Sequence, residues 1–329
     1  MNTILKDKLH IQSIDEWREH YKGSSRAVYR LKLQELASRY DHIYCLDSDM
    51  GGLESTFGLQ FPDRFIQVGI AEANMMSIAA GMAAQGNIPF VNTMATFATT
   101  RACEQIKVDI AYNNLPVKII ATHSGVSAGY LGPTHHALED IAIMRALPNM
   151  QIMVPADSYE TAKAIEEAVH INAPVYIRLG RDEEEYIYKE DYTFTIGQSM
   201  MLKPGKDISL IATGMKPVNM ALKAHNILAD LGIEARVINM HTIKPIDQNM
   251  IIQAANETKS IVTIEEHNII GGLGSAVTEV TSQYCPIQVI RLGFEDIFCE
   301  KAGNHQEIYD HYHFDVNHIV KTAVHMCTH

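Results

Sequence analysis

Side chains that can exchange protons with a ligand follow several apolar segments in the first half of the 329-residue chain. Four such segments are followed by Asp47 and Asp49, by Glu72, by Phe97 and by His123, respectively. A second histidine, His135, lies further along the loop that begins at His123. Carboxylates and imidazoles are common general acids and bases, and an aromatic ring can pack on a ligand. Together these residue types indicate a site.

Alternating strands and helices must position these side chains. In open sheets built from β-α units, ligands bind beyond the carboxyl ends of the strands, so the candidates are expected at one rim. Repeated units of this length predict a doubly wound, mostly parallel sheet covered on both faces. The predicted strands are 42–46, 65–68, 88–91, 117–121, 151–154 and 174–178, and the predicted helices are about 24–40, 72–85, 97–112, 137–146 and one that begins after Asp157.

The alternation of strands and helices is interrupted once and then resumes, which predicts two α/β domains. Residues 1–22 are interpreted as an N-terminal extension, 23–190 as the first domain and 191–329 as a smaller second domain. A highly charged segment, Arg181–Thr193, separates the domains and is interpreted as a linker whose charges are solvated. The strands of the second domain are predicted at 208–212, 235–239, 261–264 and 287–291.

The composition argues against several classes of partner. A formal net charge of −12 and a pI near 5.7, with no basic cluster, disfavour nucleic acid and anionic membranes. Five scattered cysteines without a C-x-x-C pair predict reduced thiols in the cytoplasm. The start of the chain lacks the apolar core of a signal peptide, and no uncharged apolar run approaches the ~18 residues of a membrane span.

Each candidate also has a structural interpretation when taken alone. An acid at a helix start stabilises the helix dipole, and a lone histidine or phenylalanine is usually structural. Ser124–Ser127 lacks the G-x-S-x-G pattern of a serine hydrolase, and Gly271–Gly274 (GGLG) is interpreted as a tight turn instead of a dinucleotide site. The C-terminal histidines lack the paired ligands of a zinc site, so no metal is expected there. Only the joint placement of the candidates favours a functional site.

Longer motifs resemble one family. Phe61–Glu72 (FPDRFIQVGIAE) and Gly132–His136 (GPTHH), with Arg145–Asn149 (RALPN) and Val154–Asp157 (VPAD), are similar to the thiamine-diphosphate-dependent transketolase family. The similarity covers residues from about 25 to about 320 and corresponds to the pyrimidine-binding and C-terminal domains of that family. It implies two doubly wound α/β domains with mostly parallel sheets.

One domain of that family has no counterpart in this sequence. The diphosphate-binding domain carries a Gly-Asp-Gly stretch and a later Asn that hold the metal and the diphosphate, and no Gly-Asp-Gly occurs here. The resemblance therefore implies the smaller subunit of a split transketolase, whose partner subunit supplies the missing domain and holds Mg²⁺ or Ca²⁺. Thiamine diphosphate is expected between the two chains, and a heterotetramer is the expected assembly.

The resemblance assigns cofactor roles to four residues. Glu72 matches the acid that bonds to the aminopyrimidine nitrogen and activates the cofactor, and Phe97 matches the aromatic residue that stacks on the pyrimidine. Asp49 matches an acid near the cofactor, although Asp47 is two residues away and remains an alternative. Ile70, in the same motif as Glu72, is also expected at the cofactor.

The resemblance also assigns substrate roles. His123 and His135 match histidines that face the substrate and relay protons. Arg178 and Arg181 match the region where the family supplies an arginine to a sugar phosphate, for which a fork of donors is suited.

One position departs from the family pattern. Transketolases usually carry Asp before the Gly-Pro-Thr-His run, where it bonds to a donor hydroxyl, whereas this chain has Leu131, preceded by Tyr130. Leucine cannot accept such a bond, so the preferred donor is expected to differ, and Tyr130 and Leu131 are included among the substrate-binding candidates.

The function implied by the resemblance is transfer of a two-carbon ketol unit from a ketose or ketose phosphate to an aldehyde. Two alternatives stay open. One is a decarboxylating relative, either similar to deoxyxylulose-phosphate synthase or a beta subunit of a 2-oxo-acid dehydrogenase. The other is a non-catalytic partner subunit that has kept the fold.

Overall fold

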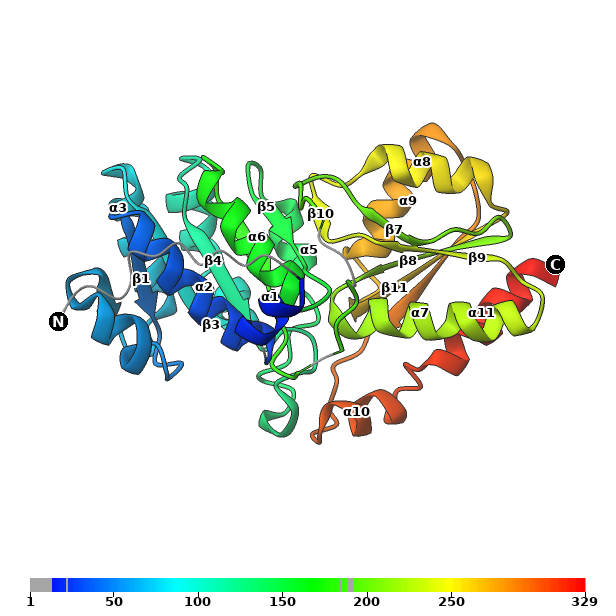
Figure 1. The fold of residues 1–329 in the computed structure, drawn as a ribbon, viewed down its shortest axis with the longest axis horizontal. Coiled ribbons are helices and arrows are strands. Elements are labelled where there is room, and N and C mark those ends of the chain that lie inside the picture. Colours follow the sequence, from blue (N-terminus) through cyan, green and yellow to red (C-terminus); the bar gives the residue numbers. More distant parts are fainter. Residues whose placement is uncertain (1–13, 22, 184, 189–191, 329) are drawn as a thin grey trace.

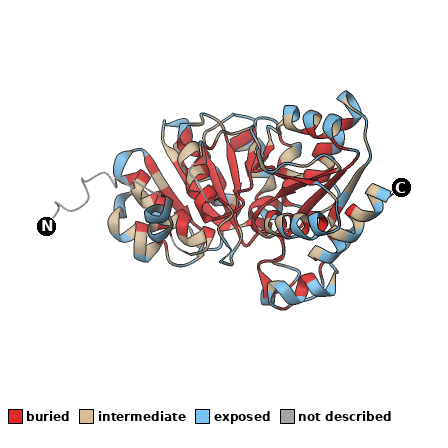
Figure 2. Ribbon diagram, turned by 45° about the vertical axis from the view of Figure 1, so that its right-hand side comes forward, coloured by how far each residue is buried: buried red, intermediate tan, exposed pale blue. Residues whose placement is uncertain are grey.

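The computed structural model contains two open sheets, each covered by helices on both faces (Figure 1). The structure describes residues 14–21, 23–183, 185–188 and 192–328. In both halves the buried strands lie between layers of partly exposed helices (Figure 2). This architecture confirms the predicted α/β class. Most of the predicted extension over 1–22, and residues 189–191 of the predicted linker, lie outside the described residues.

The first sheet has seven strands in the order β10-β5-β6-β4-β3-β1-β2. All its neighbours pair in parallel except β10, which pairs antiparallel with β5. The strands are β1 (Ile43–Asp47), β2 (Phe65–Gln67), β3 (Ile88–Met94), β4 (Lys118–Thr122), β5 (Gln151–Met153), β6 (Val175–Arg178) and β10 (Thr242–Lys244). Because β10 follows the linker in sequence, the second half of the chain completes the sheet of the first.

The helices of the first half are α1 (Ile14–His20), α2 (Ser25–Arg39), α3 (Glu72–Ala84), α4 (Cys103–Gln105), α5 (Asp140–Ala146) and α6 (Ser158–His170). Side-chain caps start two of them: Ser24 accepts from the backbone of Ala27, and Asp157 accepts from that of Glu160. The predicted helix over 97–112 is present, but most of it is not a regular α-helix. Wide π-helical turns at Phe97–Arg101 and Ile106–Ala111 flank the short α4.

The second sheet has five strands in the order β12-β11-β8-β9-β7, with only β7 antiparallel to its neighbour. Its strands are β7 (Met200–Lys203), β8 (Ile208–Thr213), β9 (Ala235–Asn239), β11 (Ile261–Asn268) and β12 (Val289–Phe294). Its helices are α7 (Met215–Asp230), α8 (Gln248–Glu257), α9 (Leu273–Tyr284), α10 (His305–His311) and α11 (Val316–Thr328).

The glycine turn before α9 has a structural cause. Glu265, buried in β11, accepts the backbone N–H groups of Leu273 and Gly274 at 2.6 and 2.8 Å. A Cβ at Gly272 would lie 2.0 Å from the Glu265 carboxylate, so this helix start requires glycine. The geometry agrees with the interpretation as a tight strand-to-helix turn.

The two sheets share an apolar core. One buried cluster includes Met76 of α3, Ile119 of β4, Ile238 of β9 and Val277 of α9. The rims of the two sheets are therefore fixed relative to each other by packing. No helix among the described residues has both the length and the apolar character needed to cross a membrane.

Candidate active site

The carboxyl ends of β1 and β3 meet at the rim where the sequence places its candidates. Asp47 at the end of β1 is fully buried and accepts hydrogen bonds from Asn92, Gln67 and the backbone of Met50. Asp49 is exposed, with a left-handed φ of 62°. Asp47 therefore organises the rim, whereas Asp49 presents its carboxylate at the surface of the rim.

Glu72 is the first residue of α3, and it is 1% exposed. Its Oε2 accepts a hydrogen bond of 2.7 Å from Nη1 of Arg101. The Arg101 guanidinium also lies over the Phe97 ring, 4.3 Å from its centroid. A buried carboxylate and an aromatic ring thus share one cationic neighbour. Ile70 lies two residues before Glu72 in the sequence, and its side chain is 73% exposed.

The two candidate histidines extend the cluster. The ring of His135 meets the edge of Phe97 with centroids 5.2 Å apart. His123 follows β4, is buried, and has a left-handed φ of 56°, which L-residues other than glycine rarely adopt. Its Nδ1 lies 3.0 Å from the hydroxyl of Thr122. The predicted residues Glu72, Phe97 and His135 are therefore brought into one chain of contacts.

Burial and nearby cations keep His123 neutral. Burial is the largest effect, and together with the charges of Arg26 and Arg181 it lowers the pKa of His123 to about 4, although Asp182 opposes this. His123 is therefore neutral at physiological pH, with one ring nitrogen that donates and one that accepts. Arg181 thus lies close enough to His123 for its charge to act on the imidazole.

We expect the pKa of His123 to be measurable directly. Its imidazole resonances in a nuclear magnetic resonance titration should move with a midpoint near pH 4. Because the folded pKa lies below the unfolded value of about 6.5, the unfolded chain binds more protons between these values, and the contribution of His123 to stability falls as pH decreases through that window. A midpoint near 6.5 would contradict the buried, cation-flanked environment. His318, which is exposed, provides the internal comparison.

Two arginines of the cluster were missed by the sequence analysis. Arg101 lies four residues after Phe97, and this helical spacing could have identified it as a neighbour of the ring. Arg26, in the first turn of α2, donates a 2.8 Å hydrogen bond to the carbonyl of Met50. No local pattern connects Arg26 with the rim, because α2 comes before the first strand.

Arg178 does not occupy the place expected for a substrate ligand. It is buried at the end of β6, and its Nε donates to Asp140 at 2.7 Å. Its Nη2 donates to the carbonyls of Ala137 and Glu266 and to the second oxygen of Asp140. Arg178 holds the pKa of the buried Asp140 below its usual value although burial opposes this. The geometry corrects the prediction: Arg178 joins the two halves of the chain.

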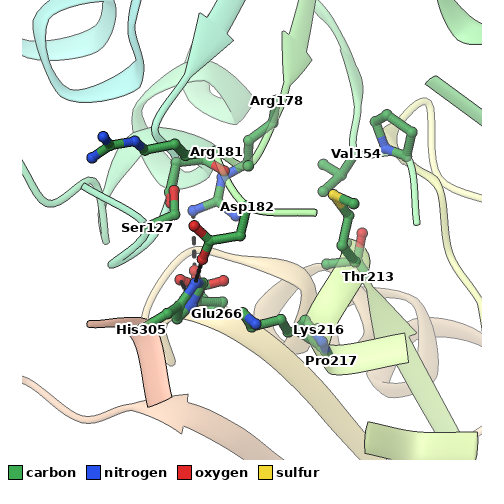
Figure 3. Close-up of a pocket in the computed structure, with 15 residues that line it drawn as sticks. Ser127, Val154, Arg178, Arg181, Asp182, Thr213, Lys216, Pro217, Glu266 and His305 are labelled. Carbon is green, nitrogen blue, oxygen red and sulfur yellow. Dashed lines mark hydrogen bonds and ion pairs between the residues drawn. The ribbon is translucent and has the colours of Figure 1, made fainter. Parts of the chain in front are cut away.

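The charges of the segment after Arg181 were predicted to be solvated, and this prediction is wrong for Asp182. Asp182 accepts a 2.8 Å hydrogen bond from Nδ1 of His305. Figure 3 shows this pair with Glu266 in a cavity between the two halves of the chain. The cavity volume, about 30 Å³, holds a few water molecules at most and is too small for a sugar phosphate.

Tyr130 and Leu131 lie in a short turn, Gly129–Leu131, and are 74% and 46% exposed. The Tyr130 hydroxyl donates a weak 3.5 Å hydrogen bond to Glu307 of α10. Gly129 has a φ of 61°, and a Cβ there would lie 3.0 Å from the carbonyl of Gly303. This turn therefore contacts the C-terminal half while it exposes two apolar side chains beside the GPTH run.

Comparisons with known proteins agree with this architecture. The family model of the transketolase pyrimidine-binding domain matches residues 22–185, and that of the transketolase C-terminal domain matches residues 197–319. A chain of Methanocaldococcus jannaschii described as a transketolase C-terminal section is 42% identical, over 92% of this chain and 95% of that one. A 6-deoxy-6-sulfo-D-fructose transketolase subunit of Clostridium sp. is 40% identical, over 84% and 86%.

A solved structure is also similar. It is a split gene transketolase described as an inactive beta4 tetramer, with a TM-score of 0.87 and 41% sequence identity. The match covers 93% of this chain and 98% of that chain. The resemblance noted in the sequence is thereby confirmed. This chain belongs to the transketolase family and contains that family's pyrimidine-binding and C-terminal domains.

Proposed function

We propose that this chain is one subunit of a two-chain, thiamine-diphosphate-dependent transketolase-type enzyme. The enzyme transfers a two-carbon ketol unit from a ketose or ketose phosphate to an aldehyde. The observation that carries the proposal is that buried Glu72 and the Phe97 ring both contact Arg101 at the rim of a transketolase pyrimidine-binding domain. Relatives described as transketolase subunits support it.

The residues present fit the pyrimidine half of the cofactor. A carboxylate that is almost fully buried can bond to a ring nitrogen, and Phe97 offers a face for stacking, while Asp49 and Ile70 border the same rim. When bound, thiamine diphosphate supplies a nucleophilic carbon that cleaves and forms carbon–carbon bonds next to a carbonyl. Glu72 would hold a proton at the pyrimidine nitrogen.

The diphosphate and its divalent cation are assigned to a partner chain. The Gly-Asp-Gly stretch that holds them in this family is absent from the sequence. Among the described residues, no group of three His, Cys, Asp or Glu side chains is placed to bind a metal ion. Relatives described as transketolase subunits support the proposal of a second subunit that carries the diphosphate-binding domain with Mg²⁺ or Ca²⁺, and of a heterotetramer as the working assembly.

The remaining cluster supplies groups for the substrate. His123 is neutral and flanked by arginines, so it can donate a hydrogen bond to a substrate oxygen or accept one from a substrate hydroxyl. His135 contacts the ring of Phe97, which is proposed to stack on the cofactor. Arg181, together with Arg26, gives the site a cationic side suited to a phosphate. Leu131, in place of the family's Asp, cannot bond to a donor hydroxyl, so the preferred donor differs from that of an ordinary transketolase.

Reconstitution with the partner chain tests this function. The expected result is ketol transfer from a ketose phosphate to an aldehyde that requires both chains and thiamine diphosphate. Release of carbon dioxide from pyruvate without ketol transfer would contradict the proposal and support a decarboxylating relative. Absence of turnover with every donor class would instead support a non-catalytic subunit.

Arg101 provides a prediction about cofactor binding. The guanidinium contacts both groups proposed to hold the pyrimidine, so binding must break its ion pair with Glu72. The Arg101 side chain is 46% exposed, and such pairs contribute up to about 1 kcal/mol, so Arg101→Gln should tighten cofactor binding by the complex at most about fivefold. Titration calorimetry measures this change.

The control for this experiment is Arg64→Gln, because Arg64 also lies over a phenylalanine ring, Phe61, at 4.3 Å but not at the proposed site. Its cofactor affinity should equal that of the wild type. Weaker binding by Arg101→Gln would show that Arg101 holds the cofactor instead of competing with it.

A further inference from the structure

The C-terminal half of the chain reaches the loop between His123 and His135 through a buried carboxylate. Glu266, near the end of β11, accepts a 2.7 Å hydrogen bond at Oε1 from the backbone N–H of Val126. Gly125 has a φ of 60°, and a Cβ there would lie 2.3 Å from the same oxygen. The close approach of this carboxylate therefore requires a glycine in the loop and fixes the path of the backbone.

His305, at the start of α10, connects this carboxylate with a second segment. Its Nε2 lies 2.9 Å from Glu266 Oε1, and its Nδ1 lies 2.8 Å from Asp182 Oδ2. Asp182 directly follows Arg181, the cation next to His123. Figure 3 shows the three side chains together in the cavity between the two halves. We call Asp182, His305 and Glu266 the interdomain triad.

The charges of the interdomain triad are complementary. Burial alone would lower the pKa of His305, but Glu266 and Asp182 overcome this effect and raise it to about 9. The other titratable or charged groups that face the triad are Lys216 at the start of α7, Arg178, Arg181 and His136, and burial lowers the pKa of His136 and favours its neutral form. Lys216 opposes the protonation of His305, but less than the two carboxylates favour it. At physiological pH the triad is a buried cation between two anions.

We propose that the interdomain triad is a positioning element for the substrate side of the active site. Glu266 holds the loop that joins His123 to His135, and Asp182 holds the segment that carries Arg181, with His305 as the bridge. The C-terminal domain thereby sets the distance between the histidines and the cation that face the substrate. This inference rests on the proposed function and assigns the C-terminal domain a task in it.

The geometry largely separates this role from that of the cofactor groups. Glu72 and Phe97 follow other strands of the first sheet, and they meet the loop held by the triad only at its far end, where His135 contacts Phe97. A change in the triad should therefore alter donor binding much more than cofactor binding. A residue that only stabilises the fold would reduce all activities together.

The first test is His305→Gln in the two-chain complex, with His311→Gln in the same helix as the control. Loss of one charge-assisted hydrogen bond predicts a roughly tenfold higher donor KM, with kcat and cofactor affinity nearly unchanged. The donor KM of the wild type should also rise as pH increases through about 9, where His305 loses its proton, and this rise should be absent in His305→Gln. His311→Gln should behave as the wild type in every respect.

A second pair of variants approaches the same contact from both sides. Glu266→Gln keeps an acceptor for Val126 but removes the charge opposite His305, and Gly125→Ala forces the loop away from the carboxylate. Both should raise the donor KM and accelerate amide hydrogen exchange at Val126. Hydrogen exchange does not depend on turnover, so it tests the positioning of the loop even if the complex shows no ketol transfer and the proposed function fails.

The outcomes separate the two proposals. Faster exchange over residues 124–132 with a raised donor KM supports the positioning role. Unchanged exchange and unchanged KM in both His305→Gln and Glu266→Gln overturn it. A parallel loss of kcat, cofactor affinity and melting temperature also overturns it, because the triad would then be a structural contact without a specific effect on the substrate.

Discussion

Replacement of Glu72 by Gln in the two-chain complex is expected to lower kcat by roughly 10²- to 10⁴-fold, the usual contribution of a positioned proton-transfer group. Gln has the same shape and can still accept from Arg101, so the fold and, in the absence of cofactor, the contact at 2.7 Å should persist. The Gln side chain cannot exchange a proton with the pyrimidine nitrogen of the cofactor, as the Glu72 carboxylate is proposed to do. Steady-state kinetics with saturating cofactor measure the effect.

The control for Glu72→Gln is Glu104→Gln, because Glu104 is an exposed acid in the neighbouring short helix α4. It should leave kcat unchanged. Turnover of Glu72→Gln close to that of the wild type would show that Glu72 is only an acid at a helix start, which is the structural interpretation of this residue.

The second large effect concerns stability. Arg178→Ala should lower the free energy of unfolding by about 3–5 kcal/mol, because it leaves the charge of Asp140 buried without a partner. Asp140 is 0% exposed, and the same substitution removes hydrogen bonds to the carbonyls of Ala137 and Glu266. The effect should therefore include the contact between the two halves of the chain. Urea denaturation measures it.

An exposed ion pair provides the comparison for Arg178→Ala. Arg39 pairs with Glu166 at 2.8 Å, but the two side chains are 50% and 40% exposed, so Arg39→Ala should cost less than about 1 kcal/mol. Wild-type stability of Arg178→Ala together with a raised donor KM would contradict the structural role and restore the predicted substrate contact.

The fold could be predicted from the sequence where local patterns determine it. Buried strands such as β4 and β8 are short apolar segments between turns, and their alternation with helices specifies a parallel sheet. The edge strands β7 and β10 were not predicted. Each has three or four residues, too few to show a period, and β10 pairs antiparallel with β5 through a tertiary contact. Local sequence carries no information about that partner.

Candidate site residues could be identified from the sequence where they follow predicted strands, but their tertiary partners could not. Glu72, Phe97 and His123 could be proposed as candidates because each follows a strand, and the rim of the sheet brings such positions together. Arg178 was misassigned because a terminal strand residue can point into the interior, and only the structure shows the buried Asp140 beside it. Asp182 was interpreted as solvated because its partner His305 is 123 residues away.

We propose that this chain supplies one half of a cofactor site and that a partner chain supplies the other. The most direct measurement is hydrogen exchange at the thiazolium carbon of thiamine diphosphate, followed by nuclear magnetic resonance with this chain alone, the partner alone and both together. We expect accelerated exchange only when both chains are present, and we expect it to require the Glu72 carboxylate of this chain. Equal acceleration by the partner alone would contradict it.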